Sequence, residues 1–211
     1  MFFMKKLFLI LLFLVAFPLA AEQGEFQILV GAGGYFPLKQ YTQDQEVYIY
    51  ASYNIPLTIY FGFTDNFDIG FNGSFTRITD TNIKTEYNGL KGREYMDYYH
   101  VNLNARLRYN WLPGYIFFEP HIFVGIGDSI ENFSNRQFYL DGNKLYNDYK
   151  ESDYTKGTLN FQAGLDFTSR VWRFLLVSVE LVYNHNIRNA NYFELNGYIG
   201  FDIFLKSYGG R

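Results

Sequence analysis

Residues 98–111 read YYHVNLNARLRYNW, and this stretch decides which folds the chain can adopt. Its odd positions are apolar or aromatic: Tyr99, Val101, Leu103, Ala105, Leu107, Tyr109 and Trp111. Its even positions from 100 onward are polar or charged: His100, Asn102, Asn104, Arg106, Arg108 and Asn110. Alternation with a period of two residues predicts a β-strand with two chemically opposite faces. By itself, this strand fits either a soluble sandwich or the lipid-facing wall of a membrane barrel.

The same alternation recurs along the chain, separated by turns and polar segments. The predicted strands lie at about residues 26–36, 47–63, 67–76, 98–111, 118–127, 159–167, 175–184 and 193–205. Long and short connections alternate between most of them, and no helical periodicity is found after the leader. The pattern predicts an all-β protein, an eight-stranded antiparallel up-and-down β-barrel, and alternation alone does not decide between a soluble and a transmembrane β-barrel. Pro56 and Pro120 remove ladder donors, so local irregularity is expected in the second and fifth strands.

The first 21 residues have the organisation of a secretory signal peptide. Lys5 and Lys6 precede the apolar run 7–17, and small residues at 20–21 offer a cleavage site before Glu22. The run is shorter than the roughly 20 residues that a spanning helix needs. We therefore expect residues 1–21 to be a signal peptide and residues 22–211 to form the barrel domain.

The composition excludes several classes of function. Removing Lys5 and Lys6 with the leader changes the net charge from −3 to −5, because 16 Lys and Arg then face 21 Asp and Glu. Basic residues form no stripe, so no nucleic-acid partner is expected. The chain has no cysteine, which rules out disulfides and thiolate metal sites. No cofactor is expected.

Three patterns favour lipid on the apolar face. Every lysine after the leader falls in a predicted loop or the tail: Lys39, Lys84, Lys91, Lys144, Lys150, Lys156 and Lys206. A soluble barrel would carry lysines on its outer faces, so a lipocalin-like binder is the less favoured alternative. The polar faces are mainly Asn, Gly, Ser and Gln, as in a confined interior. Aromatic residues, including Tyr35, Tyr60, Tyr109, Trp172 and Tyr192, gather near strand ends as membrane-interface girdles would.

On these features the chain resembles the small eight-stranded outer-membrane barrels of Gram-negative-type bacteria, the OmpX, OmpA-barrel and OmpW-like group. The end of the last predicted strand, Tyr198–Leu205 (YIGFDIFL), resembles the recognition strand that such proteins present to the barrel-assembly machinery. The resemblance implies export to the outer membrane and contact with outer-membrane lipid.

An eight-stranded barrel is narrow enough for side chains to fill its interior. The predicted interior charges form a polar network: Arg106, Arg108, Glu119, Asp166, Glu180, Glu194 and Asp202, with Asp68 nearby. Buried charges need partners, so we interpret them as a structural plug of ion pairs and hydrogen bonds. This predicts a non-catalytic protein with an envelope-structural or surface-interaction role. The alternative is a narrow channel for small or apolar solutes, which inward glycines would widen.

An enzymatic alternative follows from the resemblance alone. Some similar outer-membrane barrels modify the acyl chains of lipid A with a His, a Ser and an acid near the outer rim. Here His100, Asp128 and Ser129 lie at the outer ends of neighbouring predicted strands, but Ser and Asp at a loop entrance are also common turn residues. The catalytic hypothesis is therefore the less favoured one.

The long polar segments 77–97 and 128–157 are the candidate contact surface for an extracellular ligand. Each contains a hairpin signal, with tips predicted at Asn88-Gly89 and Asp141-Gly142. The strands beside them could extend beyond the membrane as a protruding sheet. Tyrosine-rich loops of mixed charge are good contact surfaces, although solvated loops without a partner look the same in sequence.

Overall fold

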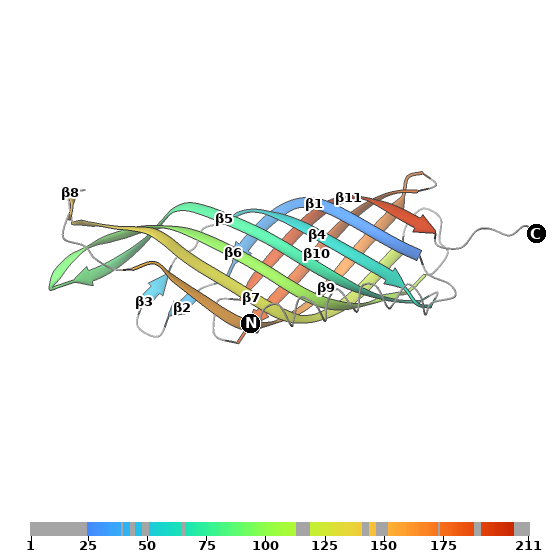
Figure 1. The fold of residues 1–211 in the computed structure, drawn as a ribbon, viewed down its shortest axis with the longest axis horizontal. Helices are drawn as coiled ribbons and strands as arrows, with labels where there is room; N and C mark the ends of the chain where they lie inside the picture. Colours follow the sequence, from blue (N-terminus) through green and yellow to red (C-terminus); the bar gives the residue numbers. More distant parts are fainter. Residues whose placement is uncertain are drawn as a thin grey trace, which may run out of the picture.

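Eight long strands form a closed barrel in the computed structural model (Figure 1). The structure describes residues 25–38, 40–42, 45–47, 51–64, 66–112, 119–140, 144–146, 152–172, 174–187 and 191–204. The predicted signal peptide, the tip residues Asp141 and Gly142, and Leu205 lie outside these residues. No helix within the described ranges is long and apolar enough to cross a membrane.

The barrel wall consists of β1, β4, β5, β6, β7, β9, β10 and β11. Their bounds are β1 Glu25–Pro37, β4 Ser52–Gly62, β5 Phe67–Tyr87, β6 Leu90–Asn110, β7 Glu119–Leu140, β9 Tyr154–Arg170, β10 Leu175–Asn186 and β11 Tyr192–Phe204. Each pairs antiparallel with its neighbours in the order β6-β5-β4-β1-β11-β10-β9-β7, and pairing of β6 with β7 closes the ring. Three short strands, β2 (Gln40–Thr42), β3 (Gln45–Val47) and β8 (Lys144–Leu145), complete the described elements. The predicted eight-stranded antiparallel barrel is confirmed.

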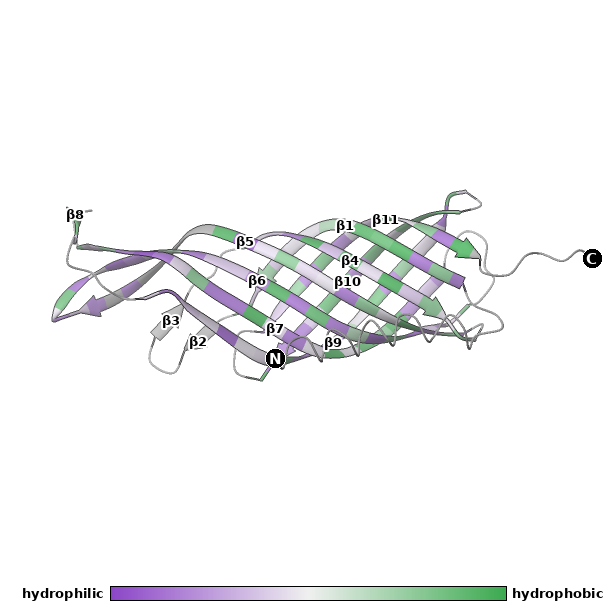
Figure 2. Cartoon of the chain, in the orientation of Figure 1, coloured by the Kyte–Doolittle hydropathy of each residue, from purple (hydrophilic) through white to green (hydrophobic). Residues whose placement is uncertain are grey.

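Hydrophilic and hydrophobic residues alternate along the strands of the wall (Figure 2). Their burial gives the two faces the polarity of a membrane barrel. In β6, Leu103 and Leu107 point outward and are 53% and 43% exposed, whereas Asn104, Arg106 and Arg108 are buried in the lumen. The same alternation in the other strands leaves outward-facing Val, Leu, Ile and Phe side chains exposed around the barrel. The outer surface is therefore apolar and the interior polar, the reverse of a soluble protein.

Beyond the barrel, β5, β6 and β7 continue as a protruding sheet (Figure 1). We use this name for residues 81–99 of β5 and β6 with residues 132–140 of β7. Segments 77–97 and 128–157, predicted as loops, are thus largely strands, and Lys84, Lys91, Lys144 and Lys156 lie in strands. The two-residue turn Asn88-Gly89 closes the β5–β6 hairpin with φ of 51° and 78°, the geometry that Asn-Gly favours. Ladder pairing continues to this turn, which is why the segments are ordered.

The two prolines are accommodated without a change of register. Pro56 pairs with Ser74 of β5, and Pro120 is the second residue of β7, opposite Phe167. On the other side of β4, the pairing to β1 is interrupted between Val30 and Gly33, where Pro56 has no N–H to donate. The predicted irregularity is therefore limited to missing ladder bonds. The register shifts between described strands lie instead in the protruding sheet, between Ile78 and Thr81 and between Tyr95 and Asp97.

Candidate functional site

The first candidate site is an arginine cluster in the lumen, near the end with the short turns. We use this name for Arg106 and Arg108 with their partners. Arg106 donates from Nη1 to Glu180 Oε2 at 2.6 Å and from Nε to Gln162 Oε1 at 2.8 Å. Its guanidinium lies 4.3 Å from the centre of the Phe123 ring. Since β6 and β10 are not neighbours in the sheet, the Arg106–Glu180 pair spans the lumen.

Arg108 makes the next layer of the arginine cluster. Its Nε donates to Asp68 Oδ2 at 2.7 Å, its Nη1 to Asp166 Oδ2 at 3.1 Å, and its Nη2 to Gln27 Oε1 at 2.6 Å. The guanidinium stacks 3.7 Å from the centre of the Tyr60 ring. Each arginine is thus surrounded by acceptors and an aromatic face, an arrangement that stabilises a buried cation. Tyr60, predicted to belong to an interface girdle, faces the lumen instead, because its position in β4 has inward parity.

The remaining predicted interior charges lie near this cluster or above it. Asp202 pairs closely with Arg170, which also lies 3.6 Å from Glu25. Glu119 lies 3.9 Å from His121, at the start of β7. Glu194 is higher in the lumen and accepts from Ser74 at 3.2 Å. Arg170 lies beyond the predicted strand 159–167. It is the last residue of β9, and this extension of the strand places it beside Asp202.

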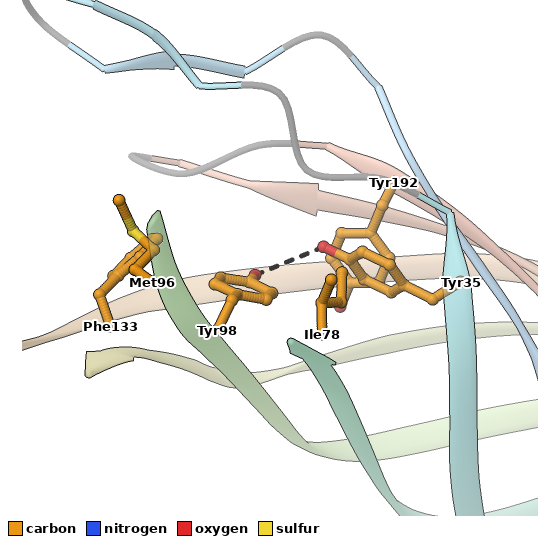
Figure 3. Packing of buried hydrophobic residues seen from close by; sticks show 6 residues of the cluster. All are labelled: Tyr35, Ile78, Met96, Tyr98, Phe133 and Tyr192. Carbon is orange, nitrogen blue, oxygen red and sulfur yellow. Dashed lines mark hydrogen bonds between the residues drawn. The ribbon is translucent and has the colours of Figure 1, made fainter. Parts of the chain in front are cut away.

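The second candidate site lies near the end with the long hairpins. We name it the tyrosine cluster and define it as Tyr35, Tyr98, His100 and Tyr192; Figure 3 shows the three tyrosines. The hydroxyls of Tyr35 and Tyr98 lie 3.4 Å apart, and Tyr98 donates to Glu131 Oε1 at 2.9 Å. The ring of Tyr192 lies 4.7 Å from that of Tyr35 and 4.9 Å from that of His100. Because β1 and β6 are not adjacent, the Tyr35–Tyr98 contact crosses the lumen.

This cluster was missed because tyrosine is ambiguous in sequence. Tyr35 and Tyr192 were assigned to an interface girdle from their positions near strand ends, yet both are fully buried inside the barrel. Strand parity was the available signal: Tyr35 shares the inward face of β1 with Gln27 and Leu29. An amphipathic ring fits a membrane interface and a polar interior equally well. Strand parity is therefore the signal that distinguishes an outward-facing tyrosine from one in the lumen.

The structure brings together two of the three residues of the enzymatic alternative. His100 Nε2 lies 2.6 Å from Ser129 Oγ, and both side chains are fully buried. Asp128 is on the opposite face of β7, exposed between outward-facing Leu103 and Leu159. Nδ1 of His100 has no hydrogen-bond partner within the described residues, so no acid there orients the imidazole as a catalytic triad requires. The pair is placed to form a hydrogen bond between the neighbouring strands β6 and β7.

The third candidate site is the end of the protruding sheet, beside the Asn88-Gly89 turn. Its outward face carries a basic square, which we define as Lys84, Glu86, Lys91 and Arg93. Lys84 pairs across the strands with Arg93, and Glu86 with Lys91. Three of four neighbouring side chains are therefore cationic, and no ion pair joins Lys84, Lys91 or Arg93 to any described residue. Like charges directly opposite on a sheet repel, so this surface carries positive charge that is only partly balanced by Glu86.

The inward face of the protruding sheet has its own packing. Tyr87, Phe138 and Tyr146 contact one another, and Phe138 is completely buried. Arg136 pairs closely with Glu94 and lies over the Tyr154 ring at 5.2 Å. Burial raises the pKa of the Tyr154 hydroxyl, and the nearby Arg136 opposes that shift. These contacts give the protruding sheet a fixed shape.

Within the described ranges, no group of three His, Asp or Glu side chains is placed to hold a metal ion.

The sequence matches no protein-family model and no curated protein. Solved structures match over most of the chain. OprG from Pseudomonas aeruginosa has a TM-score of 0.59 at 13% identity, covering 87% of this chain and 98% of that one. A major outer membrane protein from Thermus thermophilus has a TM-score of 0.59 at 9% identity, covering 85% of this chain and 99% of that one.

Ail, the attachment invasion locus protein of Yersinia pestis, in complex with the heparin analogue sucrose octasulfate, has a TM-score of 0.52 at 13% identity, covering 86% of this chain and 99% of that one. At these identities the similarity establishes the fold alone. The shared fold is that of the small outer-membrane β-barrels, as the sequence predicted.

Proposed function

We propose that this protein is an integral outer-membrane β-barrel, exported with residues 1–21 as its signal peptide, that acts without catalysis in the envelope or at the cell surface. The observation that carries the proposal is the reversed polarity of the wall, with an apolar exterior and a charged interior whose arginines are paired. In water this surface would expose a large continuous apolar area, which soluble monomers avoid. In lipid it is the expected exterior. Assembly through Tyr198–Leu205 is part of the same proposal.

Location in the outer membrane is the first test. We expect the protein in the detergent-extracted outer-membrane fraction, migrating faster on gels when unheated than after boiling, because a closed barrel resists unfolding by detergent. Recovery of the protein in the soluble periplasm, with no change of migration on boiling, would contradict the proposal and favour a lipocalin-like binder.

The lumen contacts favour a plugged barrel over a narrow channel. The Tyr35–Tyr98 and Arg106–Glu180 contacts each cross the lumen, at two different levels. Planar bilayers containing the purified barrel are therefore expected to show no sustained discrete conductance steps. Such steps from the unmodified protein would instead support the channel.

For the surface role, we propose that the basic square at the end of the protruding sheet binds an anionic glycan. Three cationic side chains lie together in a chain whose net charge is −5 without residues 1–21, at a hairpin end far from the apolar wall (Figure 1). The structural similarity to Ail, which was solved with a heparin analogue, makes a sulfated glycan the first probe.

Removing the three charges should weaken this binding. We expect the K84A/K91A/R93A variant in detergent to bind immobilised heparin about tenfold more weakly than the unmodified protein, since exposed charges each contribute about 0.2–1 kcal/mol. Binding should also fall as salt rises, because exposed charges are screened. Glu86→Gln is the matched control and should bind heparin at least as well. If the triple variant bound heparin as strongly as the unmodified protein, the basic square would not be the glycan-binding site.

A further inference from the structure

Between the two clusters, the lumen is lined by amide side chains. We define the asparagine tier as Asn54, Asn72, Asn104, Asn160, Asn184 and Asn196, all of them buried. The order along β6 fixes its level: Tyr98 and His100 lie at one end, Asn102 and Asn104 follow, and Arg106 and Arg108 lie at the other end. Ladder pairing places Asn72 and Gly127 beside Asn104, and Asn160 beside Gly127.

The amides of the tier satisfy only part of their hydrogen-bonding capacity with protein. Asn160 Nδ2 donates to Asn104 Oδ1 at 3.2 Å and to Asn184 Oδ1 at 3.0 Å, which links β6, β9 and β10 across the lumen. Asn72 Nδ2 donates to Thr58 at 2.8 Å. These bonds leave both donors and acceptors of the tier free.

Seven buried amide atoms of the tier have no partner within the described residues. The donors are Nδ2 of Asn54, Asn104 and Asn184, and the acceptors are Oδ1 of Asn54, Asn72, Asn160 and Asn196. A buried polar atom without a hydrogen bond is strongly destabilising, and buried polar groups are almost always paired with protein or ordered water. Seven such atoms would together oppose folding by an amount comparable with the stability of a whole domain.

We propose that the asparagine tier is a hydrated compartment, in which ordered water or a small uncharged polar solute bonds to the free amide atoms. A molecule that both donates and accepts matches the mixed set, and such water typically makes two to four hydrogen bonds. The side chains of the tier are uncharged, although Asn196 Nδ2 also donates to the carboxylates of Glu180 at 3.2 Å and Glu194 at 3.3 Å. The free atoms are amide donors and acceptors, which water or a neutral polar solute can satisfy.

The same geometry assigns a role to each cluster as a seal of this compartment. The tyrosine cluster crosses the lumen on one side of the tier through Tyr35 and Tyr98, and the arginine cluster crosses it on the other side through Arg106 and Glu180. The inference rests on the proposed function to the extent that it assumes a folded barrel in lipid or detergent. It does not depend on the surface role.

Hydration of the tier can be measured directly by NMR of the refolded full-length barrel in detergent micelles. We expect the side-chain amides of Asn54, Asn104 and Asn184 to show cross-relaxation with water. Asn160 is the internal control, because both hydrogens of its amide are used in bonds to Asn104 and Asn184. Amides of Asn54, Asn104 and Asn184 that show cross-relaxation only with protein protons would overturn the compartment.

Sealing can be tested with a single introduced thiol, because the chain has no cysteine. In the otherwise unmodified barrel, Asn54→Cys should react with a cationic methanethiosulfonate reagent at least tenfold more slowly than Asn88→Cys at the exposed hairpin turn. Adding Tyr98→Ala and Tyr192→Ala should raise the reaction rate of Asn54→Cys at least tenfold. Equal rates for the two thiols in the unmodified barrel would overturn the seal, and so would an unchanged rate in the tyrosine variant.

Folding of every variant is checked by the gel shift on heating. If the protein lies in the outer membrane and shifts on heating, but the amides of the tier show no contact with water, this inference alone is overturned. A chain that remains soluble in the periplasm overturns the proposed function.

Discussion

Replacing Arg106 with methionine is expected to lower the free energy of unfolding by about 3–5 kcal/mol, the range for breaking a fully buried ion pair from one side. Arg106 is buried, and its Nη1 lies 2.6 Å from Glu180 Oε2. Without it, Glu180 keeps Tyr198 as a donor at 2.8 Å but loses its counter-charge. The measurement is urea unfolding of the barrel in lipid vesicles, followed by tryptophan fluorescence.

The control for this prediction is the double variant R106M/E180L. Removing both charges leaves apolar side chains of similar volume, which is often close to neutral for a buried pair. The double variant should therefore recover most of the stability that Arg106→Met loses. A double variant as unstable as the single one would show that the pair acts through its other contacts, such as those of Arg106 with Gln162 and Phe123.

Gly127→Ala is expected to destabilise the barrel by about 3 kcal/mol, at the upper end of the usual range for overpacking. A Cβ at Gly127 would lie 1.9 Å from the carbonyl oxygen of Leu103 and 2.6 Å from Cα of Asn104. Both atoms belong to the backbone of β6, so relieving the contact requires the β6–β7 ladder to move. Urea unfolding in vesicles and the fraction of protein that shifts on heating are the two measurements.

Gly197→Ala is the matched control, because it adds the same methyl group to a strand glycine on the outward face. The nearest atom to its Cβ would be the carbonyl oxygen of Ala32, at 3.9 Å. Its unfolding free energy should stay within about 0.5 kcal/mol of the unmodified protein. If Gly127→Ala and Gly197→Ala were equally stable, close approach of β6 and β7 at Gly127 would be refuted.

In the candidate sites, the sequence predicts which side chains face the lumen but not which of them meet. The inward parity of Arg106, Arg108, Asp166 and Glu180 is readable from the alternation, but their pairing is not. Which acid meets which arginine depends on the strand order around a closed ring, and Arg106 of β6 contacts Glu180 of β10 across the lumen. The same holds for His100, which meets Ser129 but not Asp128, because neighbouring residues of a strand point to opposite faces.

Local sequence was sufficient to specify the wall of this protein. Period-two alternation, with an even number of strands and tight turns between many of them, is a local property, and each strand carries the information for its own two faces. The Asn88-Gly89 turn was equally local, since only residues that tolerate positive φ fit it. The interior, in contrast, depended on closure of the ring. Closure brings together side chains from non-adjacent strands, and that convergence turned three tyrosines into a cross-lumen cluster and six asparagines into a tier.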